Sequence, residues 1–146
     1  MDLILWRHAE AEDTAPDSQR KLTAKGRKQA KAVAAWLEPR LRAPWSVLAS
    51  PLTRAQETAN ALTNKFTTVD EIATAAFPAQ LLKAAGWPDT EGTVVVVGHQ
   101  PMLGRVAVRL LCDENVDCSM KKGAVWWFRQ REDRAVLIAV TSPEML

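Results

Sequence analysis

Two histidines, His8 and His99, are the residues of this chain whose type and placement suggest chemistry. His8 follows Arg7 at the end of the apolar run 3–6, and His99 follows four valines and a glycine. Short apolar runs are typical of buried strands, and open α/β sheets gather ligand-binding groups at the carboxyl ends of their strands. The sequence therefore predicts that both imidazoles reach one edge of a sheet, where each can act as a nucleophile, a base or a cation.

Arg54 is a third candidate, because it lies near the start of a predicted helix. Ser50-Pro51 is a strong helix start, with serine as the N-cap and proline in the first turn. The apolar stripe of this helix is expected at Leu52, Ala55, Ala59, Leu62 and Phe66. Arg54 lies off the stripe, where free amides and the helix dipole already favour anions. It is either a phosphate or carboxylate clamp or an ordinary surface arginine.

Elements able to position these residues alternate along the chain. We expect strands at 3–6, 46–49, 67–72, 94–98, 124–129 and 135–141, with the last two joined as a hairpin through 130–134. We expect helices at 24–38 with Thr23 as N-cap, 51–66, 78–85 and 101–111. This alternation predicts a three-layer α/β/α sandwich with a mostly parallel central sheet, in one domain that covers residues 1–146.

Composition narrows the classes of partner and location. The chain has 146 residues, of which 47% are apolar, and a formal net charge of +2. This mild charge does not indicate a nucleic-acid-binding protein, which would need clustered basic residues. No apolar run is long enough to span a membrane, and no secretory leader precedes the first strand. Cys112 and Cys118 are too few for a disulfide scaffold. We therefore expect a cytoplasmic protein without a nucleic-acid or membrane partner.

Several kinds of chemistry are excluded by missing motifs. The chain has no Gly-x4-Gly-Lys-Ser/Thr loop, no Gly-x-Gly-x-x-Gly loop, and no cysteine-based phosphatase loop. The acidic segment 113–117 lacks the glycine and closing glutamate of a calcium loop. Two histidines and two cysteines in unrelated contexts do not form a zinc motif. We expect neither a metal nor another cofactor.

The first predicted helix carries a basic face formed by Lys25, Arg27, Lys28 and Lys31. This face is either an ordinary solvated surface or a docking surface for an acidic partner.

Four motifs in register resemble those of the histidine phosphatase superfamily. They are Leu5-Trp6-Arg7-His8-Ala9-Glu10, Leu22-Thr23-Ala24-Lys25-Gly26, Ser50-Pro51-Leu52-Thr53-Arg54 with Thr58-Ala59, and Gly98-His99-Gln100-Pro101. The resemblance implies a phosphoglycerate mutase-like fold. The short span between residues 66 and 94 leaves no room for a large cap insertion, so the chain is most similar in size to small bacterial phosphohistidine phosphatases.

The resemblance also implies a role for each matching residue. His8 would be the nucleophile that becomes transiently phosphorylated, and Arg7, Arg54 and His99 would surround the phosphoryl oxygens. Thr23 is a further candidate for phosphate contact. These roles agree with the need of phosphoryl transfer for positioning and positive charge. Attack requires a neutral His8 held in one tautomer, whereas we expect His99 to act as a cation, which predicts a bell-shaped pH profile.

Three positions depart from the pattern of the family. Many members have glycine where this chain has Ala9, which would cost about 1 kcal/mol if a positive φ were required. Acid phosphatases and phytases have aspartate where this chain has Gln100, and mutases use a glutamate after the middle strand, for which Glu71 is the candidate. A weak or absent general acid favours phosphohistidine as substrate, because imidazole leaves more readily than an alkoxide.

The leading hypothesis is a metal-independent phosphatase that removes phosphate from phosphohistidine on a histidine phosphotransfer protein, releasing inorganic phosphate. One alternative is a phosphatase of sugar phosphates or other small esters, which would need Glu71 as a working acid. Another is a non-catalytic module that binds phosphoproteins. The complete set of Arg7, His8, Arg54 and His99 argues against that last alternative.

Overall fold

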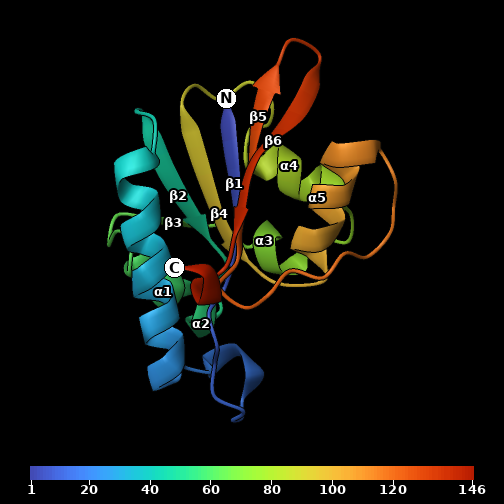
Figure 1. The fold of residues 1–146 in the computed structure, drawn as a ribbon. Coiled ribbons are helices and arrows are strands. Elements are labelled where there is room, and N and C mark those ends of the chain that lie inside the picture. The colour runs from blue at the N-terminus through green and yellow to red at the C-terminus, as the bar shows by residue number, and fades with distance from the viewer.

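A six-stranded sheet forms the centre of the computed structural model, which describes all residues from Met1 to Leu146 (Figure 1). The strand order is β3-β2-β4-β1-β5-β6. The strands are β1 (Asp2–Arg7), β2 (Trp45–Ala49), β3 (Thr67–Thr68), β4 (Thr93–Gly98), β5 (Val125–Arg131) and β6 (Arg134–Thr141). The first four are parallel, and β5 and β6 complete the sheet as an antiparallel hairpin. The predicted mostly parallel sheet is confirmed.

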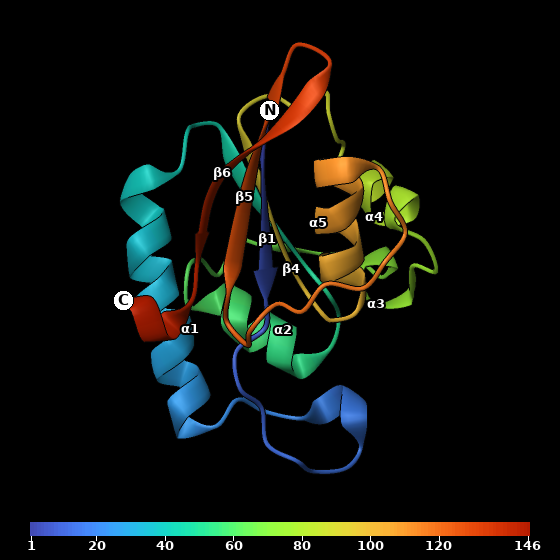
Figure 2. The same ribbon diagram turned by 45° about the vertical axis from the view of Figure 1, so that its right-hand side comes forward.

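Helices cover both faces of this sheet (Figure 2). They are α1 (Ala24–Leu37), α2 (Thr53–Asn60), α3 (Glu71–Thr74), α4 (Pro78–Ala84) and α5 (Met102–Cys112), with short 3-10 turns at Asp17–Gln19, Glu38–Arg40 and Pro143–Met145. One core cluster joins α1 and α2 to the face that carries Ile4 and Trp6. The other joins α3, α4 and α5 to the face that carries Leu3 and Leu5. The three-layer sandwich is therefore confirmed, and no large insertion interrupts it.

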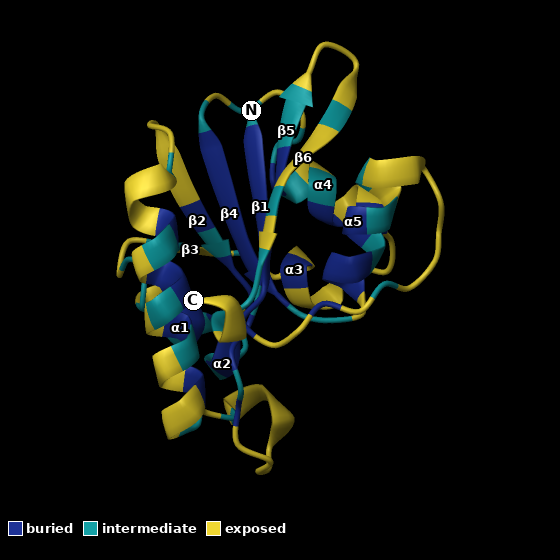
Figure 3. Cartoon of the chain, viewed as in Figure 1, coloured by how far each residue is buried: buried dark blue, intermediate teal, exposed yellow.

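β1 and β4 lie side by side in the middle of the sheet, buried on both faces (Figure 3). Burial on both faces explains why their sequences are continuous apolar runs rather than alternating ones. Their register pairs Asp2 with Thr93 and Arg7 with Gly98, so both strands end at the same level. His8 and His99 follow at neighbouring positions of this edge.

The predicted helix at 51–66 is shorter in the structure. It begins at Thr53 with Leu52 as N-cap, because Ser50 Oγ accepts from the Leu52 amide in a local turn at 3.2 Å instead of capping the helix. It ends at Asn60, where hydrogen bonds of the tighter i to i+3 type close the last turn. The expectation that Phe66 lies on this helix is wrong.

The predicted strand 67–72 is also wrong beyond its first two residues. Pairing with β2 ends after the Val69 amide donates to the Ala49 carbonyl at 2.9 Å. The Asp70 carbonyl then accepts from the Ala73 and Thr74 amides, which starts α3. Glu71 therefore lies in the first turn of a helix, not at the end of a strand.

Two smaller features lie near the end of the chain. The hairpin turn is tighter than predicted, since β5 continues to Arg131 and β6 starts at Arg134, with Glu132 at φ 55°. Leu111, an apolar residue near the end of α5, is half exposed. The hairpin extends past the rest of the sheet (Figure 1).

No helix has the length and apolar character needed to cross a membrane.

Candidate active site

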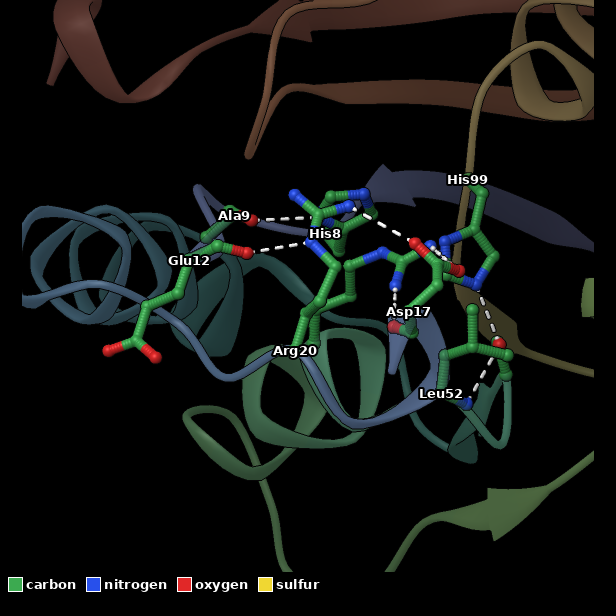
Figure 4. Close-up of polar contacts among 9 residues, drawn as sticks. His8, Ala9, Glu12, Asp17, Arg20, Leu52 and His99 are labelled. Carbon is green, nitrogen blue, oxygen red and sulfur yellow. Dashed lines mark hydrogen bonds and ion pairs between the residues drawn. The ribbon is translucent and has the colours of Figure 1, made fainter. Parts of the chain in front are cut away.

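His8 is held just past β1 with its imidazole oriented by the backbone (Figure 4). Its amide donates to the Gly98 carbonyl at 3.0 Å, which ties it to the end of β4. Its Nδ1 lies 2.7 Å from the Ala9 carbonyl oxygen. A carbonyl can only accept, so Nδ1 carries the proton and Nε2 keeps a lone pair. The side chain is only 7% exposed, so this orientation is restricted by packing as well.

The Ala9 carbonyl is itself positioned by a short chain of hydrogen bonds. The Ala9 amide donates to Thr58 Oγ1 at 3.0 Å, and that hydroxyl donates to the Arg54 carbonyl at 2.7 Å. Ala9 does not adopt a positive φ, since Asp113 and Glu132 are the only non-glycine residues that do. The strain considered for alanine at this position is therefore absent.

Two arginines lie beside the histidines, each with part of its guanidinium engaged. Arg7 Nη1 donates to the Met120 carbonyl at 2.6 Å. Arg54 Nη1 donates to the Asp17 carbonyl at 2.9 Å, and Nη2 lies 3.4 Å from Asp17 Oδ2. The Nε atoms of both arginines are buried and have no hydrogen-bond partner. Burial also lowers the pKa of Arg7 below its ordinary value.

Ser50 fixes the second histidine and was not identified from the sequence, where it was expected to cap a helix. It is fully buried, and its Oγ lies 2.7 Å from His99 Nε2. That oxygen already accepts from the Leu52 amide, and His99 Nε2 is the one acceptor within reach of its proton. The serine therefore donates to Nε2, which leaves the proton of a neutral His99 on Nδ1.

Three residues around the histidines each keep a buried nitrogen without a partner. These nitrogens are Arg7 Nε, Arg54 Nε and His99 Nδ1, and the two imidazole rings lie 5.3 Å apart between centroids. A buried donor left unpaired costs about 1 to 3 kcal/mol. A cluster of such donors on cationic groups matches an anion with several acceptor oxygens, such as a phosphoryl group.

The pKa values of both histidines are lowered in this site. Burial is the main cause for His8, whose pKa falls to about 4, and the charges of Arg54 and Arg7 add to it while the Ala9 hydrogen bond opposes it. Burial followed by His8 and Arg54 lowers the pKa of His99 to about 3. Both are neutral at pH 7 in the free protein, and the expectation that His99 acts as a cation toward a bound phosphoryl group stays a prediction. A neutral His99 still offers its Nδ1 proton to an anion.

Thr23 caps α1, as the sequence predicts. Its hydroxyl accepts from the Gly26 amide at 2.9 Å and donates to Glu10 Oε2 at 3.1 Å. A Cβ at Gly26 would lie 1.9 Å from the Glu10 carbonyl oxygen, so only glycine allows this approach of α1 to the end of β1. Phosphate contact by Thr23 stays a prediction, since its hydroxyl is engaged in the cap.

The two positions considered for a general acid differ in what they contact. Gln100 Nε2 donates to the Cys118 carbonyl at 2.6 Å and its Oε1 accepts from the Gly104 amide at 2.8 Å, so this side chain joins the 113–122 connection to α5. Glu71 is exposed, and its carboxylate makes no hydrogen bond or ion pair. Its role as an acid stays a prediction.

Asp17 and Arg20, in the polar loop 12–21, complete the surroundings of the site. Arg20 Nε donates to the Glu12 carbonyl at 2.7 Å, and its Nη1 lies 3.4 Å from Asp17 Oδ1. The neighbouring charge of Arg54 is the main cause that lowers the pKa of Asp17. Neither residue was singled out in the sequence, because a charged pair in a polar loop is indistinguishable from ordinary surface residues.

The larger hollows of the surface lie outside this cluster. One of about 550 Å³ lies between α1 and α2 and is lined by residues that include Arg27, Lys31, Glu57 and Phe66. The four residues of the basic face of α1 are exposed, and two of them, Arg27 and Lys31, line this hollow. No group of three or more His, Cys, Asp or Glu side chains is arranged to hold a metal ion.

Solved structures share this fold along nearly the whole chain. The protein histidine phosphatase SixA complexed with tungstate is 22% identical, with a TM-score of 0.77 and 99% of each chain covered. A protein from Agrobacterium tumefaciens assigned as phosphohistidine phosphatase SixA is 25% identical, with a TM-score of 0.78 and 97% of each chain covered. A phosphoserine phosphatase from Entamoeba histolytica, bound to phosphoserine, is 18% identical, with a TM-score of 0.75 and 99% and 98% covered.

No curated protein sequence matches the chain. The family model of the histidine phosphatase superfamily, branch 1, matches residues 3–76, which include Arg7, His8 and Arg54. This match covers half of the chain and agrees with the fold and with the cluster of imidazole and guanidinium groups at the end of β1 and β4. The chain belongs to the histidine phosphatase superfamily and is an enzyme of the phosphatase type.

Proposed function

We propose that this phosphatase removes phosphoryl groups from phosphohistidine side chains of phosphotransfer proteins, through a covalent phosphohistidine on His8 and without a metal. The observation that supports this most directly is the fixed tautomer of His8, which leaves Nε2 as a nucleophile beside unpaired donors. The arginines and the His99 N–H supply the electrostatic stabilisation that phosphoryl transfer requires.

In the first step, the lone pair of His8 Nε2 attacks phosphorus and the P–N bond of the substrate breaks. Arg7 Nε, Arg54 Nε and His99 Nδ1 donate to the phosphoryl oxygens, whose charge they stabilise. The substrate imidazole leaves with the electron pair of the broken bond. When its other nitrogen is protonated, it leaves as a neutral ring and needs no proton from the enzyme.

In the second step, water attacks phosphorus and the P–Nε2 bond breaks. Throughout, the Nδ1 proton stays on the hydrogen bond to the Ala9 carbonyl. The ring therefore departs as neutral imidazole rather than as imidazolate, and the electron pair returns to Nε2. The product is inorganic phosphate.

The shape around the site supports a protein substrate. Only the short elements β3, α3 and α4 lie between Phe66 and Thr93, so no domain covers the cluster. Exposed Lys25, Lys121 and Lys122 line a hollow of about 430 Å³, in which Lys121 pairs with Glu144, and Lys121 directly follows Met120, whose carbonyl binds Arg7. A phosphorylated side chain on an acidic protein surface suits such surroundings.

A small phosphate ester is the second candidate substrate, because the fold is also similar to that of a phosphoserine phosphatase. An alkoxide leaving group needs a proton donor, so this alternative requires a working acid such as Glu71.

The test compares a phosphotransfer protein phosphorylated on histidine with an aryl phosphate and a panel of sugar phosphates, all with EDTA present. We expect fast release from phosphohistidine that is insensitive to EDTA and lost in His8→Ala. Preference for sugar phosphates together with loss of activity in Glu71→Gln would favour the second candidate. Activity that survives His8→Ala would exclude the covalent mechanism.

A further inference from the structure

The loop 12–21 brings one carboxylate, that of Asp17, to the guanidinium groups of the site (Figure 4). Its base is closed by a bridge between Ala11 and Leu22 and by a hydrogen bond of 2.7 Å from the Glu12 amide to the Lys21 carbonyl. Arg20 reaches back from the same loop to Glu12 and to Asp17. Asp17 therefore occupies a defined place, although it lies in a loop.

The contacts of Asp17 are all with arginines. Arg54 donates to its carbonyl at 2.9 Å and lies 3.4 Å from Oδ2, while Arg20 lies 3.4 Å from Oδ1. The carboxylate lies toward His99 in Figure 4, and its charge opposes the lowering of the His99 pKa. The charges that shift the pKa of His8 are instead those of Arg54, Arg7 and Arg20. The Asp17 carboxylate therefore lies beside Arg54 and toward His99.

Other nearby carboxylates are engaged elsewhere. Glu10 accepts from the Thr23 hydroxyl, and Glu57 accepts from the Leu22 amide. The Glu12 side chain makes no hydrogen bond or ion pair, and Glu71 is exposed without a contact to the site. Asp17 is the carboxylate with direct contacts to a guanidinium of the cluster.

We propose that Asp17 is the base that activates the water that hydrolyses phosphorylated His8. The inference rests on the covalent mechanism proposed above. Attack on a phosphoryl group is in line, so the water approaches from the side opposite His8. The Asp17 side chain is 70% exposed beside Arg54, so water has access to its carboxylate. The oxygen of the water forms a bond to phosphorus, its proton passes to an Asp17 carboxylate oxygen, and the P–Nε2 bond breaks with its electron pair returning to His8.

A role in the second step fits the chemistry of both steps. The first step needs no acid when the substrate imidazole leaves with its other nitrogen protonated. In the second step, a base that takes a proton from the attacking water makes its oxygen a stronger nucleophile. The Asp17 carboxylate is ionised and open to solvent, so it can accept that proton, while the neighbouring charge of Arg54 lowers its pKa and with it its strength as a base.

The test separates the two steps by rapid-quench measurement of phosphorylated enzyme, with phosphoramidate as donor. In Asp17→Asn, we expect formation of the phosphoenzyme within about threefold of wild type and a loss of about 100-fold or more in its hydrolysis, a typical effect of removing a general base. Phosphorylated His8 would then accumulate. Asp17→Glu should recover part of the hydrolysis rate, because it restores a carboxylate.

Asp13→Asn is the matched control, since Asp13 is an exposed carboxylate of the same loop without a hydrogen bond or ion pair. It should behave as wild type. Equal losses in both steps of Asp17→Asn would show that Asp17 only holds Arg54, and unchanged or faster hydrolysis would show that it only occupies the anion site; either result overturns the proposal. Absence of phosphorylated His8 from every variant, with turnover that survives His8→Ala, would instead refute the covalent mechanism.

Discussion

The two ends of β1 differ in how completely their buried polar groups are hydrogen-bonded. At its start, Asp2 is almost fully buried and accepts hydrogen bonds from Trp127 Nε1 at 3.0 Å and from Arg129 Nε and Nη2 at 2.7 and 2.8 Å. Burial alone would raise the pKa of Asp2, but these bonds outweigh it and lower the pKa. Asp2 and Arg129 are thus paired with each other, and the network joins β1 to β5.

At the other end of the strand, the polar groups are only partly satisfied. Arg7, Arg54 and His99 each keep a buried nitrogen without a partner, although each also makes at least one strong hydrogen bond. Buried donors in this state reduce stability unless a ligand pairs them. The comparison teaches that the same strand is stabilised at one end by complete pairing and made able to bind an anion at the other by incomplete pairing.

The largest expected effect is that of His8→Ala at the incompletely paired end. Removal of the proposed nucleophile should reduce kcat on phosphohistidine by about 10⁴-fold or more. The free energy of unfolding should change far less, because the neutral imidazole makes only one hydrogen bond, to the carbonyl of the adjacent Ala9. Steady-state kinetics and urea denaturation measure the two quantities. A large loss of stability with little loss of kcat would reverse the contrast between the two ends.

The second effect is a decrease in the free energy of unfolding at acidic pH. The pKa values of His8 and His99 lie near 4 and 3 in the folded protein and near 6.5 when unfolded, so the unfolded state binds more protons below pH 6.5. Stability contributed by these groups is present at pH 7 and is lost as the pH falls toward 4. We expect a drop of about 3 kcal/mol in unfolding free energy between pH 7 and 5, measured by urea denaturation.

His8→Ala should remove about half of that drop. The lowered pKa of Asp2 acts only at lower pH, since its stabilisation is lost below about pH 4. An unfolding free energy that is constant from pH 7 to 5 would contradict the burial of neutral histidines.

The third effect is that of Asp2→Ala at the fully paired end. It leaves Trp127 Nε1 and Arg129 without their acceptor, so we expect a loss of about 2 kcal/mol in unfolding free energy. The KM for phosphohistidine and the kcat at 25 °C should stay within twofold of wild type. Asp133→Asn, an exposed carboxylate of the hairpin turn, is the control for a simple change of charge. A loss of activity as large as that of His8→Ala would show that the two ends are not separate.

The smallest effect is that of Ser50→Ala. Without the serine proton, His99 Nε2 loses its donor and the Nδ1 tautomer is no longer fixed, so kcat/KM should fall about tenfold, the value of one hydrogen bond. Nitrogen-15 NMR of the imidazole should show Nδ1–H in wild type and a mixture of tautomers in the variant. Ser50→Thr, which keeps the hydroxyl, should retain the wild-type tautomer. Detection of Nε2–H in wild type would refute this assignment.

The sequence predicts the framework of the site better than its details. β1 and β4 are recognisable because burial on both faces demands continuous apolar residues, and their shared edge follows from parallel pairing. The position of Ser50 beside His99 was hidden because Ser-Pro is equally typical of a helix start. Glu71 was misplaced because β3 has only two residues, a length at which a strand pattern carries little information. Asp17 depends on how a polar loop folds, which follows no periodicity.

The two ends of the 12–21 loop are joined by hydrogen bonds, so the length of the loop has little effect on the elements on either side of it. The Ala11–Leu22 bridge and the hydrogen bond between Glu12 and Lys21 hold the two ends of the loop together, so a change in its length does not by itself move β1 or α1. Doubling such a loop costs only about 0.6 kcal/mol in closure entropy. Residues 13–16, which precede the contacts of Asp17 with Arg54, are therefore a natural insertion point, where added residues could reshape the entrance for a different substrate while the sheet and the histidines stay in place.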